Sequence, residues 1–180
     1  MLIRRKLIRR RAEELLAKGE VTNPPVPVEE LARHLGIVVQ RQQGDDELSG
    51  FILRDPRRNF AVIGVNETHH SNRQRFTIAH ELGHFLLHAG ESLHVDKNGS
   101  GYEVKHRDAR SGEGKSVDEM EANLFAAELL MPATFLESDI ADEGAFSLSD
   151  DVKIRRLANR YAVSAQALTL RLSYLGYVSG

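Results

Sequence analysis

The stretch FTIAHELGHFLLHAG, residues 76–90, sets ionisable side chains inside an apolar helical pattern. His80, Glu81 and His84 have apolar residues on both sides, so a helix formed here would bury them. Burying two imidazoles and a carboxylate without partners costs on the order of several kcal/mol. The chain must therefore supply or bind something that compensates these groups.

The spacing of these groups matches H-E-x-x-H, which predicts a metal site. Residues four apart share one face of a helix and lie about 6 Å apart along its axis, so His80 and His84 can converge on one zinc. Glu81 is rotated by about 100° and borders the site, where it can take a proton from water and act as the catalytic base. The alternative is a structural histidine pair whose hydrogen bonds are satisfied within the core.

A catalytic zinc is usually held by three protein ligands, and the two histidines supply only two of them. The extended motif H-E-x-x-H-x-x-G-x-x-H is excluded, because Leu87 and Gly90 stand where it needs glycine and histidine. His88 lies about 12 Å along the helix from His80, too far to share its metal. We therefore expect His88 to be exposed or to lie outside the ligand set.

The later segment DEMEANLFAAELLMP offers four carboxylates for the third position. Asp118 and Glu119 fall in the first turn of the predicted helix, where capping and the helix dipole explain them. Glu121 is favoured because Met120, Leu124 and Ala127 would form an apolar stripe beside it. Glu128 is the alternative, and it lies about 10 Å further along the axis.

The pattern along the chain predicts an α+β fold. A capping box at Ser71 predicts the start of the histidine-bearing helix, and residues 91–115 are expected to be a long surface loop. The runs 37–42, 48–54 and 60–66 predict three short strands in an antiparallel meander. We expect one domain over 1–180, with a basic N-terminal helix (1–20), a catalytic core (25–135) and helix-turn-helix-like C-terminal helices (149–178).

Composition narrows the class of protein. The 180 residues carry a net charge of −2 and contain no cysteine, which excludes disulfides, cysteine-ligated metals and thiol nucleophiles. No apolar run approaches the roughly 20 residues that a membrane helix needs. We expect a soluble, cytoplasmic protein with no membrane partner.

Two basic regions raise the possibility of DNA binding, which we nevertheless disfavour. The N-terminal run MLIRRKLIRRR is interpreted as a solvated basic helix. The C-terminal pair of helices turns at Val163-Ser164, but its groove-facing positions are mostly small and uncharged. Arg171 and its neighbours could reach phosphates, although packing against the core or docking a substrate fits better.

Side chains in the predicted loops could stabilise the oxyanion of an acyl transition state. No spacing selects among these candidates, which are His69, His70, His94, Tyr102 and His106.

FTIAHELGHFLLH followed by EANLFAAELLMP resembles the ImmA/IrrE family of zincin-like metallopeptidases. The resemblance covers residues 25–135 strongly and the C-terminal tail more weakly. It implies a zincin-like fold with zinc held by His80, His84 and Glu121, and Glu81 as the catalytic glutamate.

The resemblance also implies an endopeptidase that cleaves a helix-turn-helix repressor in a stress, phage or mobile-element response. We expect the strand FAVIGVN to be an edge that could align the substrate. A His₂–Glu set also accepts other divalent ions such as Mn²⁺. The rival hypothesis is a non-enzymatic DNA- or protein-binding regulator with a structural metal.

Overall fold

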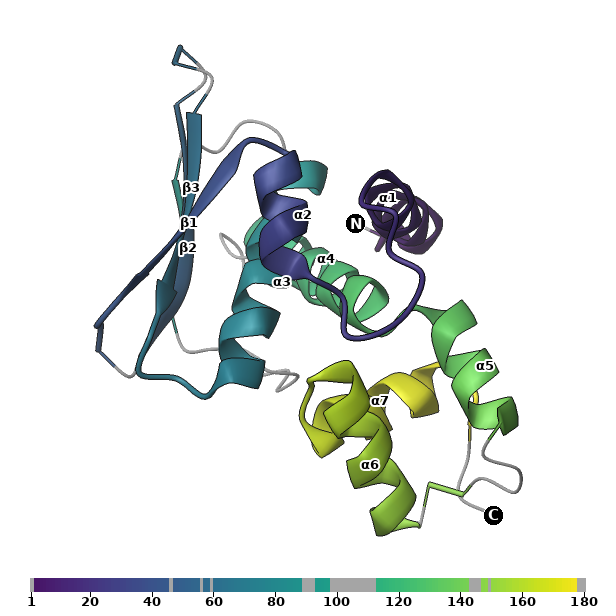
Figure 1. Ribbon diagram of the computed structural model, residues 1–180. Helices are drawn as coiled ribbons and strands as arrows, with labels where there is room; N and C mark the ends of the chain where they lie inside the picture. Colours follow the sequence, from purple (N-terminus) through teal and green to yellow (C-terminus); the bar gives the residue numbers. More distant parts are fainter. Residues whose placement is uncertain are drawn as a thin grey trace.

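The sheet contains the three predicted strands and a fourth that the sequence did not indicate (Figure 1). The computed structural model describes residues 2–45, 47–55, 57–58, 60–88, 93–97, 113–142, 147–148 and 150–177, without the side chains of 93–97, 113–116 and 142. The strands are β1 (Ile37–Gln42), β2 (Leu48–Asp55), β3 (Phe60–Asn66) and β4 (Leu93–Lys97). The fourth strand lies in the segment expected to be a loop, and the rest of that predicted loop, up to residue 112, lies outside the described residues.

The strand order is β1-β3-β2-β4, which corrects the predicted meander. Strand β3 pairs with β2 in antiparallel and with β1 in parallel orientation, so β3 is a central strand and cannot be the substrate-aligning edge. Its residues from Ala61 to Asn66 are all buried, and β3 lies between two neighbouring strands. The sheet is mostly antiparallel, because β4 also pairs with β2 in that orientation.

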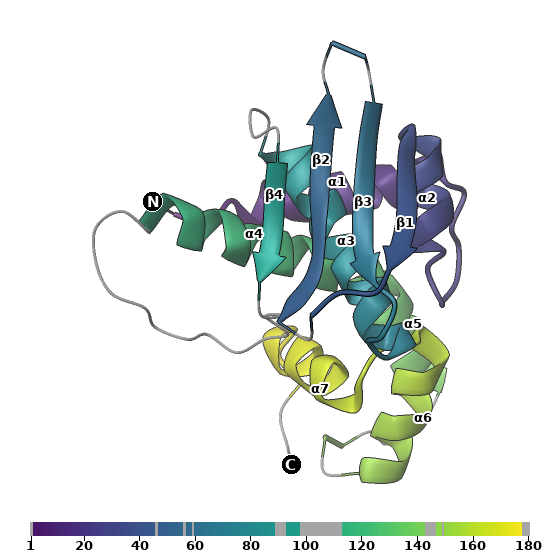
Figure 2. The same ribbon diagram turned by 90° about the vertical axis from the view of Figure 1, so that its left-hand side faces the viewer.

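Helices cover one face of the sheet, as both views show (Figures 1 and 2). Ile52 and Ile63 on the strands and Ile78 and Leu82 on α3 belong to one buried core. Helices α2 and α3 contact the sheet, and α4 and α1 form the next layer. The helices are α1 (Arg5–Lys18), α2 (Val28–His34), α3 (Ser71–Leu87), α4 (Glu113–Leu130), α5 (Ala133–Asp142), α6 (Asp151–Tyr161) and α7 (Ala165–Tyr174).

Local chemistry explains two of the helix boundaries. Gly36 follows α2 with a φ of 74°, the left-handed conformation in which glycine ends helices. Ser164 caps α7, because its side chain accepts a hydrogen bond from the Ala167 amide at 3.1 Å. No described helix is both long enough and apolar enough to cross a bilayer.

A buried ion pair joins the C-terminal helices to α4. Arg171 on α7 donates through two nitrogens to Glu128 at 3.0 and 2.6 Å and through Nε to the Met131 carbonyl. Arg171 is only 1% exposed, so the expectation that it could reach phosphates was wrong. A charged side chain can remain buried when a partner of opposite charge compensates it, as Glu128 does for Arg171.

Helices α3 and α4 pack closely at Gly83, which lies between His80 and His84. A Cβ added at Gly83 would stand 3.0 Å from the Ala122 Cα and 3.2 Å from the Ala122 carbonyl oxygen. Because backbone atoms cannot turn aside as a flexible side chain can, any larger residue must separate the two helices.

Gly83→Ala should therefore destabilise the protein even though alanine favours helices. Overpacking costs about 1–3 kcal/mol, and the gain in helix propensity offsets about 1 kcal/mol. We expect a net loss of roughly 1 kcal/mol in urea denaturation. Gly44→Ala is the control, since its nearest contact would be an ordinary 3.5 Å from the Asn66 side chain. A Gly83→Ala protein at least as stable as the wild type would contradict this packing.

Candidate metal centre

Helix α3 holds His80 and His84 in its most buried segment. The helix starts one residue earlier than the capping box predicted, because His70 is the N-cap and its Nδ1 accepts from the Asn72 amide at 3.1 Å. All residues from Thr77 to His84 are buried, and His80 and His84 are 1% and 2% exposed. The two imidazoles are therefore removed from water, as the sequence pattern predicted.

The two imidazoles face each other through their Nε2 atoms, which lie 3.0 Å apart. On the other side of the His80 ring, Nδ1 lies 2.9 Å from the side-chain oxygen of Asn123 on α4. An amide oxygen only accepts hydrogen bonds, so Nδ1 donates and the neutral ring keeps the lone pair of Nε2 toward His84. This is the tautomer that a metal-binding histidine requires.

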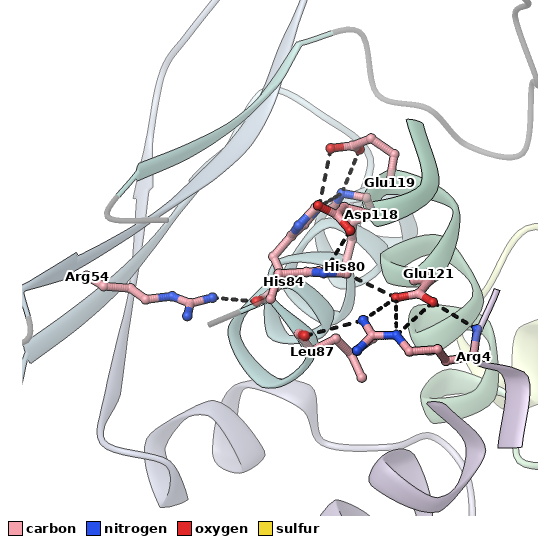
Figure 3. Close-up of polar contacts among 9 residues, drawn as sticks. Arg4, Arg54, His80, His84, Leu87, Asp118, Glu119 and Glu121 are labelled. Carbon is pink, nitrogen blue, oxygen red and sulfur yellow. Dashed lines mark hydrogen bonds and ion pairs between the residues drawn. The ribbon is translucent and has the colours of Figure 1, made fainter. Parts of the chain in front are cut away.

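Glu119 on α4 completes a three-residue group with the histidines (Figure 3). Its carboxylate oxygens lie 3.4 Å from His80 Nε2 and 3.4 Å from His84 Nε2. Ligand atoms about 2.0–2.1 Å from a tetrahedral zinc stand roughly 3.3 Å from one another. The three side chains therefore have the chemistry and the separations of three corners of a zinc site.

The electrostatics of the group favour an ionised Glu119. Burial acts to raise the pKa of this carboxyl, but its interactions with the His80 and His84 rings outweigh burial and hold the pKa well below the ordinary value of 4.5. The side chain of Glu119 is 33% exposed while both rings are buried, so the group opens toward solvent on the carboxylate side.

Glu121, the predicted third ligand, does not face the two histidines. Its carboxylate pairs with Arg4 instead, and Glu119 takes the position expected for it (Figure 3). Two sequence arguments failed. Helix α4 begins at Glu113, so Glu119 lies beyond the first turn that capping would explain. Met120 is 42% exposed, so the apolar stripe that favoured Glu121 is not the buried face of α4.

A second group of possible ligands lies beside the first and consists of His88, Asp118 and Glu121. His88 Nδ1 is 3.1 Å from Asp118, and its Nε2 is 3.9 Å from Glu121. Because Arg4 already donates to both oxygens of Glu121, this group is charge-compensated, and we assign no metal to it. His88 lies outside the ligand set, as expected.

Two other predicted candidates have clear positions. Glu81 is fully buried on α3 next to His80, and Glu128, the alternative ligand, is committed to Arg171. Among the oxyanion candidates, His70 serves as the helix cap described above. Tyr102, His106 and the side chain of His94 lie outside the described residues.

Two residues that support the site were missed from the sequence. Asn123 stands four residues after Glu119, so both belong to one face of α4, and that spacing could have identified the pair. Arg54 on β2 donates to the backbone carbonyl of His84 and stacks over the Phe85 ring, with 4.8 Å between the guanidinium carbon and the ring centre. No sequence signal connects Arg54 to α3.

Comparison with known proteins identifies relatives of this chain. A family model described as the IrrE N-terminal-like domain, a peptidase of class M78, matches residues 32–173. The chain is 31% identical over 126 residues to uncharacterized immunity region protein 2 of Bacillus phage phi105, covering 70% of this chain and 69% of that protein. It is 32% identical over 120 residues to the radiation response metalloprotease IrrE of Deinococcus radiodurans, covering 66% of this chain and only 32% of that longer protein.

Glu119→Gln and Glu121→Gln form a matched pair that tests the ligand assignment. Loss of a ligand should exceed the 10–100-fold effect typical of outer-shell partners, so Glu119→Gln should lower zinc affinity by more than about 100-fold. Glu121→Gln leaves three ligands in place and should lower it by less than about tenfold. Competition with a chromophoric chelator at neutral pH measures both. Equal losses, or a larger loss for Glu121→Gln, would restore Glu121 as the ligand.

Acidification should expose the contribution of Glu121 to stability. Hydrogen bonds from the Arg4 side chain hold the pKa of Glu121 below its ordinary 4.5, against the effect of burial. A lowered folded-state pKa stabilises the protein above about pH 4.5, and this contribution disappears as the pH falls through the folded value. The difference in unfolding free energy between wild type and Glu121→Gln should therefore narrow below pH 4.5.

Urea denaturation from pH 7 to pH 3 measures this difference. Glu14→Gln is the control, since Glu14 is exposed and its pair with Arg11 contributes little. A difference that stays constant or widens on acidification would contradict the assignment.

Proposed function

This chain belongs to the M78 peptidase family, and on that premise we propose that it is a zinc-dependent endopeptidase that cleaves a helix-turn-helix repressor. The convergence of His80 Nε2, His84 Nε2 and the Glu119 carboxylate carries the proposal, because their separations of 3.0, 3.4 and 3.4 Å suit three corners of a tetrahedral site. The rival, a regulator with a purely structural metal, has less support. Structural zinc sites are closed by four protein ligands, and three are found in the described part of the chain.

Each residue of the proposed centre has a distinct task. His80, His84 and Glu119 hold the metal, and Asn123 fixes the His80 ring in its binding tautomer. When bound, zinc acts as a Lewis acid that polarises the scissile carbonyl and makes water a nucleophile near neutral pH. Other divalent ions, Mn²⁺ among them, also fit a His₂–carboxylate set.

Glu81 is proposed as the group that moves the proton. It follows His80 directly on α3 and is fully buried, so its carboxylate is shielded from bulk water. There it would accept a proton from the attacking water and then deliver it to the leaving amine of the cleaved bond. A fixed, dry carboxylate suits both steps, since no solvent reorganisation accompanies the transfer.

The proposed substrate class rests on the relatives and on the fold. One relative is named a radiation response metalloprotease, and the other is named after a phage immunity region, which supports a role in relieving repression. The sheet supports backbone recognition, since β4 pairs only with β2 among the described strands and so leaves one edge for an extended peptide.

Glu81→Gln tests the mechanism. It should lower cleavage of a helix-turn-helix repressor by about 10²–10⁴-fold, the range typical of a lost general acid–base. Zinc affinity should stay close to that of the wild type, because all three ligands remain. Mass spectrometry of the fragments measures cleavage, and Glu13→Gln, on the exposed side of α1, is the matched control.

Two outcomes would contradict the proposal in different ways. Full cleavage by Glu81→Gln would reject Glu81 as the base. An intact helix-turn-helix protein after incubation with zinc-loaded wild type would reject the substrate.

A further inference from the structure

The N-terminal segment reaches the metal-bearing helices through one arginine. Helix α1 lies before the family match, which starts at residue 32, yet it packs along α4 (Figure 1). Its apolar face is formed by Ile8, Ala12, Leu15 and Leu16, all buried. Arg4, the residue before the helix, adds polar contacts to this packing.

Arg4 surrounds the carboxylate of Glu121 with donors. The backbone amide of Arg4 donates to Oε1 at 2.8 Å, its Nε lies 3.0 and 3.1 Å from the two carboxylate oxygens, and Nη2 also pairs with Oε2. Glu121 is 1% exposed, whereas the Arg4 side chain is 40% exposed. In the described part of the chain, no other arginine or lysine forms an ion pair with Glu121.

The same guanidinium also reaches α3. Its Nη2 lies 3.4 Å from the carbonyl oxygen of Leu87, three residues after His84 (Figure 3). Glu121 stands midway between Glu119 and Asn123, the two residues of α4 that contact the histidines. One arginine therefore connects the end of α3 to the part of α4 that completes the metal centre.

We propose that Arg4 is a positioning residue for the metal centre, acting through Glu121 to hold Glu119 and Asn123 against His80 and His84. The proposal rests on the metal-binding function proposed above. It extends the centre to a helix that precedes the family match.

The physical reason is an asymmetry in burial. Without the guanidinium, Glu121 is a buried carboxylate with little compensation, and removing one partner of a buried pair is costly. The carboxylate can regain water only if α4 moves or turns, and Glu119 moves with it. Without the Glu121 charge, by contrast, the half-exposed Arg4 remains hydrated, and α4 has no reason to shift.

The test is zinc binding by Arg4→Gln, which keeps the backbone hydrogen bond and removes only the guanidinium. We expect zinc affinity to fall by about tenfold or more, the scale of outer-shell losses. The visible absorption of the cobalt-loaded protein should also change, because it reports the arrangement of the ligands. Arg10→Gln is the matched control, since Arg10 lies on α1, the helix that Arg4 precedes, with a 64% exposed side chain that pairs with Glu14.

The double variant Arg4→Gln/Glu121→Gln separates positioning from a general loss of stability. Removing both charges leaves no buried carboxylate, so zinc affinity and the cobalt spectrum should return toward those of the wild type. Such a rescue supports the proposal even if Arg4→Gln alone folds poorly.

Three outcomes would count against the proposal. It is overturned if Arg4→Gln binds zinc as the wild type does, or if the double variant stays as weak as the single one. A wild type that binds no zinc would instead reject the proposed function, and the positioning role would fall with it.

Discussion

The close contact between α3 and α4 at Gly83 is the constraint on which the rest of the site depends. His80 and His84 lie on either side of this glycine, and Glu119 and Asn123 lie on either side of Ala122, which faces it. Each helix therefore presents its polar side chains one turn apart around a point of backbone contact. Packed helices ordinarily lie about 8–10 Å apart, at a distance set by the residues at the contact. Because Gly83 has no side chain, α3 and α4 come close enough to bring the Glu119 carboxylate to ligand distance from the imidazoles.

Helix α4 carries buried and half-buried polar groups on several faces, and each has a different partner. Glu119 faces the histidines, Asn123 orients His80, Glu121 pairs with Arg4, and Glu128 pairs with Arg171. The partners come from α3, the N-terminal segment and α7, so elements far apart in the chain meet on one helix. Each buried acid needs its own cation or hydrogen-bond donor, so these pairings fix the rotation of α4 about its axis. Packing of apolar residues alone would specify that rotation less strictly.

Much of the fold and two of the three candidate metal ligands could be predicted from the sequence. The strands β1, β2 and β3 and the positions of His80 and His84 follow from local periodicity and spacing, which act within a few residues. The choice between Glu119 and Glu121 depended on the start of α4 and on which face meets α1, and neither is local. The same holds for β4 and for the parallel pairing of β1 with β3, since contacts distant in the chain decide both.

The ion pair between Arg4 and Glu121 also has a consequence for the order in which the protein is made. Arg4 is synthesised before its partner, which lies 117 positions later in the chain. At synthesis rates of about 5–20 residues per second, the N-terminal helix waits on the order of ten seconds for the helix it packs against. During that interval its apolar face has no native partner on α4, and the ligand set is incomplete. The nascent chain therefore acquires the geometry of the candidate metal centre late, only after α4 has been made.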